Sequence, residues 1–284
     1  MLDYRMKTFV TLCRTMNYRR TAEALNITQP AVTQHIKYLE EHYGCRLFSY
    51  EKRKLSMTCH ASLLLRYAYS QHYQEQKLIE NMGAPAGCHF SIGTTKTIGE
   101  YVIAGQVERF LAEPANRLSI ETDNTLRILE LLNEGRIDFA LIEGFFDRKL
   151  YDHRLYRTEP YIGFCSRQHP FAGRTVALAD LWKETIVVRE KGSGSRSILE
   201  RMLLAENHSL YDFHRIISIG NLALLEQLVA RRCGITFAYQ IAGGENPLLA
   251  EFRVEGWQIE RAFHYVFLPH TDAGKSVEIF ERFR

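Results

Sequence analysis

The sequence predicts an α/β chain with an N-terminal all-α winged helix-turn-helix unit and a larger body of two doubly wound α/β lobes. Residues 5–58 contain three short helical patterns followed by a basic strand pair. From Cys88 onward, strand and helix patterns alternate, which is typical of parallel α/β sheets. The first 60 residues hold ten of the 36 basic side chains but only five of the 33 acidic ones. A positively charged unit therefore precedes a slightly negative body, and 284 residues leave room for about two domains.

Two short helices open the chain. The first is indicated by apolar residues at i, i+3, i+4 and i+7, namely Met6, Phe9, Val10 and Cys13. The second runs from about Arg19 to Leu25, and only Asn26 and Ile27 separate it from the next helix. Asn tolerates the left-handed backbone conformation that so tight a turn requires. This is the spacing of a helix-turn-helix.

The third helix begins after Thr28, which suits the N-cap, and carries Pro30 in its first turn. Its buried stripe is predicted to be Val32, Ile36, Leu39 and Tyr43. The opposite side carries Pro30, Thr33, Gln34 and Lys37, and the acids are held back to the far end. Alone, such a run would be an ordinary surface helix. Its place after a helix-turn spacing favours a recognition helix.

A basic hairpin follows the three helices. Apolar and polar residues alternate over 45–58, and the tip carries Lys52, Arg53 and Lys54. A compact basic unit suits DNA, because neutralising phosphates releases counterions. Basic patches also serve solubility or anionic membranes, but no amphipathic membrane helix or lipidation signal accompanies this one.

Residues 5–58, and in particular "FVTLCRTMNYRRTAEALNITQPAVTQHIKYLEEHYGCRLF", resemble the DNA-binding domain of LysR-type transcriptional regulators. The resemblance implies that DNA is contacted by Thr28, Gln29, Pro30, Thr33, Gln34 and Lys37 of the recognition helix and by Arg46, Lys52, Arg53 and Lys54 of the wing. Gln can bond adenine edges bidentately, whereas Lys and Arg on the wing mainly set the register on the backbone. One departure from the family is "TCHA" (58–61), where Thr-Glu-Ala-Gly is common.

A long helix is predicted over Ser62–Met82, a stretch without Pro or Gly. Its apolar side would be formed by Leu64, Ala68, Leu78 and Met82. It resembles the family's linker helix, through which two chains pair, so a homodimer and, from the family, a homotetramer are expected. A two-fold pair reads a palindrome with half-sites about one helical turn apart. "GAPAG" (83–87) is the clearest linker, which sets the expected domains at 1–60, 61–87 and 88–284.

The body resembles the periplasmic-binding-protein-like effector domain of the same family. Its expected elements include one helix over "TIGEYVIAGQVERFLAE" (97–113) and a strand at "YIGFCS" (161–166). The resemblance implies that the chain crosses between lobes near Pro160 and returns near Trp257 to Phe263. Lobe I would then comprise 88–160 and 264–284, and lobe II 161–263.

A ligand in such a body is expected at the carboxyl ends of strands, against helix N-termini whose N–H groups attract anions. Four loops fit: "GTTKT", "TDNT", "EKGSGSR" and "GN". They supply the candidate effector residues Thr94, Thr95, Lys96, Thr97, Asn124, Thr125, Ser193, Ser195, Arg196 and Asn221. Each alone is most often a helix cap. Together the four loops indicate that the co-inducer is a small carboxylate or inorganic oxyanion, to which Arg196 would donate hydrogen bonds. Closure of the lobes on this ligand would change the contacts with promoter DNA and RNA polymerase.

Other functions are argued against by missing motifs. There is no apolar signal region and no apolar run of about 18 residues, so a cytoplasmic protein without a membrane partner is expected. No GxSxG, P-loop or dinucleotide motif supports an enzyme, and no metal-ligand spacing appears, so neither catalytic residues nor a cofactor is expected. A transport solute binder would not need the basic unit. A thiol switch through Cys165 and Cys233 remains the alternative, although packing explains both residues.

Overall fold

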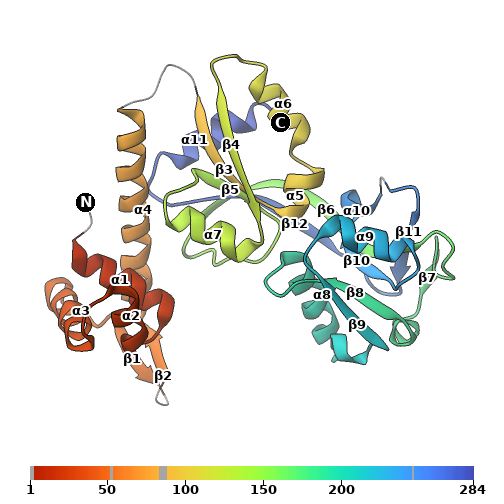
Figure 1. Ribbon diagram of the computed structural model, residues 1–284, viewed down its shortest axis with the longest axis horizontal. Helices are drawn as coiled ribbons and strands as arrows, with labels where there is room; N and C mark the ends of the chain where they lie inside the picture. The colour runs from red at the N-terminus through yellow and green to blue at the C-terminus, as the bar shows by residue number, and fades with distance from the viewer. Residues whose placement is uncertain (1–2, 52–53, 83–87, 245) are drawn as a thin grey trace.

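The structure is a computed structural model that describes residues 3–51, 54–82, 88–244 and 246–284. Figure 1 shows a small N-terminal head, the long helix α4 (Cys59–Asn81), and a body of two lobes. Lobe I here denotes the half built on β3, β4 and β5 with α5, α6, α7 and α11. Lobe II denotes the half built on β7 to β11 with α8, α9 and α10. The predicted α/β fold class with a winged helix-turn-helix head is confirmed.

The head contains α1 (Tyr4–Thr15), α2 (Tyr18–Leu25) and α3 (Gln29–Tyr43) around one apolar core. The turn between α2 and α3 has Asn26 in the left-handed conformation, with φ 53°. Thr28 caps α3, because its Oγ1 accepts a hydrogen bond from the N–H of Ala31 at 3.3 Å. The predicted stripe is buried except for Tyr43, which is 43% exposed. Tyr43 is the last residue of α3.

The wing is the antiparallel pair β1 (Phe48–Glu51) and β2 (Lys54–Met57), with Phe48 opposite Met57. Leu47, Phe48 and Leu55 are buried and close the core of the head. The predicted wing residues Lys52 and Arg53 lie outside the described residues, as does the expected linker 83–87.

The predicted apolar residues of helix α4 differ in exposure between its first half and its C-terminal end. Leu64 and Ala68 are buried, whereas Leu78 is 60% and Met82 82% exposed. At about 100° per residue, the four residues lie within an arc of about 80°, so they share one side of the helix. The head and lobe I cover this side in the first half of the helix, whereas its C-terminal end faces solvent.

Buried polar contacts attach α4 to lobe I. The Asp138 carboxylate accepts hydrogen bonds from the Tyr73 hydroxyl at 2.9 Å and from the backbone N–H of Ser91 at 2.8 Å, and the Lys77 ammonium lies 2.6 Å from it. The side chain of Asp138 is fully buried. Ser70 also donates to the carbonyl of Pro269 at 2.6 Å. Breaking one partner of such a buried ionic group is costly, so the helix and the lobe are held as one piece.

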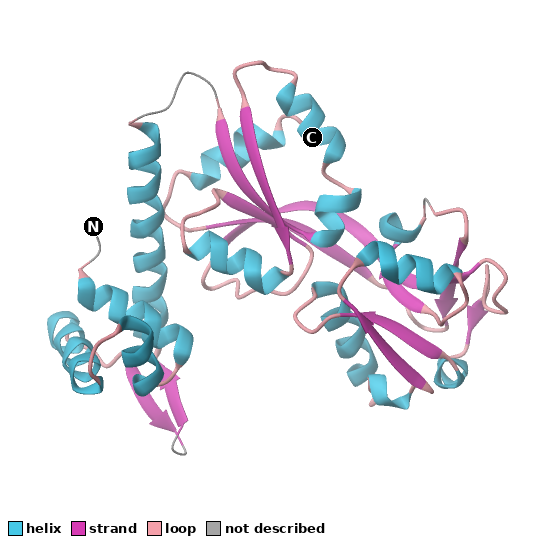
Figure 2. Ribbon diagram, viewed as in Figure 1, coloured by secondary structure: helices cyan, strands magenta, loops and turns pink. Residues whose placement is uncertain are grey.

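Lobe I contains β3 (His89–Thr95), β4 (Arg117–Asp123), α7 (Thr125–Asn133), β5 (Phe139–Ile142) and α11 (Ala273–Glu281). The single helix expected over 97–113 is two helices, α5 (Lys96–Tyr101) and α6 (Ala104–Leu111). The chain turns at Val102 and Ile103 because both Ile98 and Ile103 enter the core, which one straight helix would not allow. Helices lie on both sides of the strands (Figure 2).

Strand β6 (Asp152–Ser166) runs through both lobes. Its first part pairs antiparallel with β12 (Glu260–Phe267), and its last part pairs with β10 (Thr236–Tyr239) and β11 (Leu249–Val254). The strand is 15 residues long, although only 161–166 was predicted. The sheet is consequently mixed, not parallel throughout, since β3 is parallel to β4 and β5 but β12 is antiparallel to both neighbours.

Lobe II adds a separate parallel pair, β8 (Thr185–Arg189) and β9 (Arg215–Ile219). It also contains β7 (Thr175–Val176), α8 (Gly194–Ala205), α9 (Leu222–Ala230) and α10 (Gln240–Gly243). Two single-turn helices, η1 (Leu178–Lys183) and η2 (Leu210–Asp212), complete it. Among the described residues, no helix is long and apolar enough to cross a membrane, and no group of three His, Cys, Asp or Glu side chains is arranged to hold a metal.

Candidate functional site

The exposed front of α3 forms a shallow depression of about 580 Å³. It is lined by Gln29, Pro30, Thr33, Gln34 and Lys37. All five side chains are exposed, and the amides of both Gln29 and Gln34 make no hydrogen bond within the described part of the chain. Lys37 lies 3.7 Å from Glu41, an exposed pair that contributes little to stability and is easily exchanged. The exposed side of α3 thus presents two amide groups and one cation to a partner that has a groove.

The base of the wing is organised by Glu40. Its Oε1 accepts hydrogen bonds from the N–H groups of Leu47 at 2.8 Å and Phe48 at 3.3 Å. Its Oε2 holds the guanidinium of Arg46 at 3.1 Å, although the Arg46 side chain is still 84% exposed. Lys54 is exposed as well. These two cations flank α3 at its wing side, where a duplex backbone would pass.

In the body, the predicted effector loops meet where the two lobes touch. Lys96 of lobe I donates to the Glu190 carboxylate at 3.3 Å and to the carbonyl of Gly220 at 2.7 Å. Tyr239 of lobe II donates to the carbonyl of Glu143 at 2.8 Å. These bonds cross from one lobe to the other and hold them together.

Two glycines allow a close approach of the backbones of the two lobes. A Cβ added to Gly194 at the start of α8 would lie 2.9 Å from the Cα of Gly144 and 3.3 Å from the Oγ1 of Thr125. All of these neighbours belong to lobe I. Only glycine at 194 lets the backbones come so close, so any side chain there would separate the lobes.

Glu143 lies in the middle of this junction and was not predicted. Its Oε1 accepts a hydrogen bond from the Thr97 hydroxyl at 3.0 Å, and its Oε2 has no partner. Burial raises the pKa of Glu143 from 4.5 to about 7, against the opposing effect of Thr97 and Arg189. The hydroxyls of Thr95 and Thr125 are also buried without a partner. A carboxyl group directly after the fully buried strand "FALI" is the signal that could have revealed it.

Several predicted effector residues have structural partners in this conformation. Asn124 and Asn221 cap α7 and α9, since their Oδ1 atoms accept from backbone N–H groups at 3.0 Å and 2.8 Å. Thr94 bonds to Thr122 across parallel strands. Ser193 is buried at the N-cap of α8, and Ser195 lies 3.5 Å from the Tyr161 hydroxyl.

Arg196, expected to bond an anion, instead contacts its own lobe. Its guanidinium bonds to Glu200 at 2.7 Å and to the carbonyl of Arg189 at 3.1 Å. Arg189 itself, which was not predicted, is buried beside Glu190 with Nη1 unpartnered. Arg189 is therefore a buried cation close to the junction, and Arg196 bonds to its backbone carbonyl.

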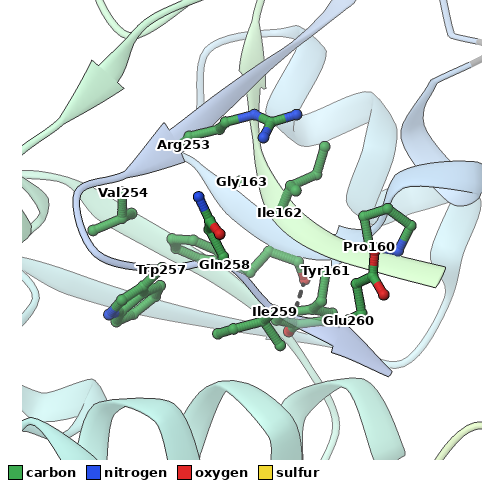
Figure 3. A pocket seen from close by; sticks show the side chains of 11 residues that line it. Pro160, Tyr161, Ile162, Gly163, Arg253, Val254, Trp257, Gln258, Ile259 and Glu260 are labelled. Atoms are coloured by element: carbon green, nitrogen blue, oxygen red, sulfur yellow. Dashed lines mark hydrogen bonds between the residues drawn. The ribbon is translucent and has the colours of Figure 1, made fainter. Parts of the chain in front are cut away.

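A second hollow of about 560 Å³ lies beside the crossing strands on the lobe II side (Figure 3). Tyr161, Arg253, Trp257, Gln258 and Glu260 line it. The backbone N–H of Tyr161 donates to the carbonyl of Ile259 at 2.8 Å and joins the two crossings at this point.

The cysteines do not form a disulfide, and all six are free thiols. Cys165 is buried in β6, where desolvation raises the pKa of its thiol to about 11. A thiol with so high a pKa contains little reactive thiolate at neutral pH. Cys233 is exposed on the turn before β10. This environment favours a packing role for Cys165 over a redox one.

Glu143 gives a pH-dependent prediction. Between its ordinary pKa of 4.5 and its raised value of about 7, the folded protein keeps a proton that the unfolded chain releases. The free energy of unfolding contributed by this residue therefore falls as pH rises through that window, by at most about 1.4 kcal/mol per pH unit. Melting curves from about pH 5 to 8 should show wild type losing stability relative to Glu143→Gln. The exposed Glu255→Gln serves as control, and a constant difference between wild type and Glu143→Gln would contradict the assignment.

Comparisons with known proteins agree with this architecture. Residues 4–62 match the bacterial regulatory helix-turn-helix domain of the lysR family, and residues 84–283 match the LysR substrate binding domain. The chain is 31% identical to the regulator CfxR of Cupriavidus necator, covering 91% of this chain and 83% of that one, and 26% identical to CysL of Bacillus subtilis, covering 97% and 94%.

Two solved structures share the fold. The OxyR C206 mutant of Corynebacterium glutamicum has a TM-score of 0.62 at 22% identity and covers 99% of this chain and 89% of its own. The CcmR regulatory domain of Synechocystis PCC6803 in complex with 2-PG has a TM-score of 0.61 at 16% identity, covering 69% and 97%. From its head to its last helix, the chain belongs to the LysR family of transcriptional regulators and not to a family of enzymes.

Proposed function

We propose that this regulator binds promoter DNA in the cytoplasm as a homodimer, and that two homodimers form a homotetramer. A small anionic effector binds between the lobes and changes the contacts of the protein with DNA and RNA polymerase. The observation that carries the proposal is the exposed front of α3. There Gln29 and Gln34 present unbonded amides on a head with ten basic and five acidic residues. Amides read base edges, while the basic wing neutralises phosphates.

Pairing through α4 is supported by the apolar side chains that the helix leaves exposed. They are Leu63, Tyr67, Leu78, Ile79 and Met82. A hollow of about 660 Å³ beside the helix, lined in part by Leu63, Leu64 and Tyr67, extends this surface toward the head. Apolar area of this kind is normally covered by a partner. A second copy of the same helix is the proposed occupant, because a two-fold pair positions two α3 helices for a palindromic site.

An effector between the lobes is supported by the polar junction around Glu143 and by relatives. The CcmR regulatory domain was solved with 2-PG and the effector domain of QuiR with shikimate, both small organic acids. Since several bonds cross the junction, a ligand that replaces them would shift one lobe against the other.

Base reading by α3 predicts a loss of specificity when its amides are removed. Gln29→Ala or Gln34→Ala should reduce the preference for a promoter fragment over random duplex by about 1–3 kcal/mol, because bidentate base contacts are lost. Lys54→Ala should instead weaken binding to both duplexes equally and reduce the salt slope by about one. Fluorescence anisotropy titrations at several salt concentrations measure both effects.

The matched control is Gln258→Ala, which removes an exposed glutamine of the body and should leave both affinities unchanged. Equal binding of wild type to promoter and random duplex, or unchanged specificity in both α3 variants, would contradict base reading by this helix.

Pairing through α4 predicts that a charge on its exposed face separates the protomers. Leu78→Arg should shift sedimentation toward the 33.0 kDa monomer, because an arginine cannot be buried unpaired in an apolar interface. Leu248→Arg is the control, since that leucine is 63% exposed in lobe II, close to the 60% of Leu78. Wild-type protein that sediments as a monomer, or a Leu78→Arg variant that sediments as wild type does, would rule out this interface.

A further inference from the structure

A third hollow, of about 320 Å³, lies where lobe I, lobe II and the crossing strand β12 meet. We call it the arginine cavity. Its lining includes Glu143, Arg148, Ile198, Glu260, Arg261 and His264. Glu143 and Arg148 belong to the end of β5 and the loop after it, Ile198 to α8, and the other three residues to β12. None of these residues belonged to the predicted effector site.

Unpartnered buried polar atoms are concentrated here. Ten buried side-chain nitrogen or oxygen atoms lack a hydrogen-bond partner in the described part of the chain. Three of them belong to lining residues of this cavity: Oε2 of Glu143, Nε of Arg261 and Nδ1 of His264. A buried polar group without a partner is destabilising, so native proteins keep few of them. Thr95 and the backbone of Ala262 interact with Glu143 and His264, but without a hydrogen bond of good geometry to these atoms. The three atoms around one hollow can therefore still bond to a polar ligand.

The charges around the cavity favour an anion. The guanidinium groups of Arg148 and Arg261 take part in none of the ion pairs found among the described residues. Of the two carboxyl groups in the lining, Glu143 is about half protonated at neutral pH, since its pKa is raised to about 7. Glu260, the other carboxyl group in the lining, is exposed to solvent. Planar guanidinium groups bind carboxylate and phosphate oxygens bidentately.

His264 is suited to a second, uncharged contact. It is 91% buried, its relative exposure being 9%, and its ring packs against Phe146 and His153 at 5.6 Å and 5.5 Å between centroids. Burial and the neighbouring Arg148 lower its pKa, so the ring is neutral at pH 7. A neutral imidazole offers one donor and one acceptor, which suits a hydroxyl or a protonated oxygen beside the anionic group.

We propose that the arginine cavity binds a small carboxylate or phosphate oxyanion through Arg148, Arg261 and His264, and that this is where the effector of the proposed function acts. The proposal rests on that function for its regulatory part only. It moves the anion away from Arg196 and the loops at 93–97, whose polar groups already bond to each other and across the lobes.

The position of the cavity explains how binding would reach both lobes. Its lining also includes Gly144, the lobe I partner in the close approach to Gly194. Arg261 pairs with Glu159 in the register of β12 and β6, the two strands that join the lobes. An anion held by Arg148 of lobe I and Arg261 of the crossing strand would therefore fix lobe I relative to the hinge.

The test is thermal stabilisation of the full chain by inorganic phosphate, 2-PG, shikimate and acetate, each at matched ionic strength. At least one of these oxyanions should raise the melting temperature in a concentration-dependent way up to about 10 mM. Arg148→Gln and Arg261→Gln should each weaken the apparent affinity about tenfold or more, the loss expected for a charge-assisted pair. Stabilisation by phosphate and 2-PG alone would indicate a phosphate ligand, and stabilisation by shikimate and acetate alone would indicate a carboxylate ligand.

Arg148 is exposed, so Arg148→Gln should fold even if Arg261→Gln does not. The control is Arg253→Gln, which removes an exposed arginine from the hollow of Figure 3 and should leave the response intact. A response that survives Arg148→Gln, or no response to any of the four anions, would overturn the proposal. Promoter binding by the wild-type protein without added anion is measured in parallel. If the wild type does not bind the promoter, but responds to an anion and loses that response in Arg148→Gln, the binding site is supported and the proposed function is contradicted.

Discussion

The pairing of β6 with β12 is the constraint on which the rest of the body depends. These two strands are the crossings between the lobes, and β6 alone supplies ladder partners to both. Each lobe can build its core on one half of β6, while the relative position of the lobes is fixed by only a few contacts beyond the strands. Those contacts include the approach of Gly194 to Gly144 and the stacking of Arg201 on Phe145. They also include the polar bonds made by Lys96, Tyr101 and Tyr239. Two lobes joined by a pair of strands and by a limited set of other contacts are suited to two discrete arrangements, which a ligand-driven switch requires.

The junction is connected to the DNA-binding head through α4. Asp138 precedes β5, whose other end leads into Glu143 and Gly144, so the buried carboxylate that holds Tyr73 and Lys77 and the residues at the lobe contact are joined by one short strand. The core of the head is continuous with apolar residues of α4 and α7. A change at the lobe junction therefore has a short, packed route to the helix that carries the head. This route is physical contiguity, and its strength as coupling is an energetic quantity that variants can measure.

The structure of the head could be predicted from the sequence because it depends on local interactions. The body was harder to predict because it depends on pairing between strands that are far apart in the chain. Thr28, Pro30 and Asn26 act within a few residues of themselves, so their roles as cap, first-turn residue and left-handed turn follow from residue type. The first nine residues of β6 carry several charged side chains and gave no strand signal, because their strand conformation is imposed by β12 a hundred residues later. Arg196 was assigned to the effector site because of its sequence motif, but its guanidinium donates a hydrogen bond to Glu200, one turn away on the same helix. Glu143 was missed because the acid after "FALI" was not weighed as a signal, and because its place at the lobe junction depends on contact with Tyr239 of the second lobe.

The most direct test of the account is the operator affinity of a variant whose lobes cannot close. Gly194→Val places a side chain against lobe I, whereas Gly220→Ala adds a Cβ that has only Glu190 of lobe II nearby, at 3.8 Å. If the lobe arrangement governs the head, Gly194→Val will change operator affinity by about five-fold or more, the range typical of allosteric coupling, while Gly220→Ala matches wild type. Two folded variants with the same affinity and the same footprint as wild type would show that the head acts independently of the lobes.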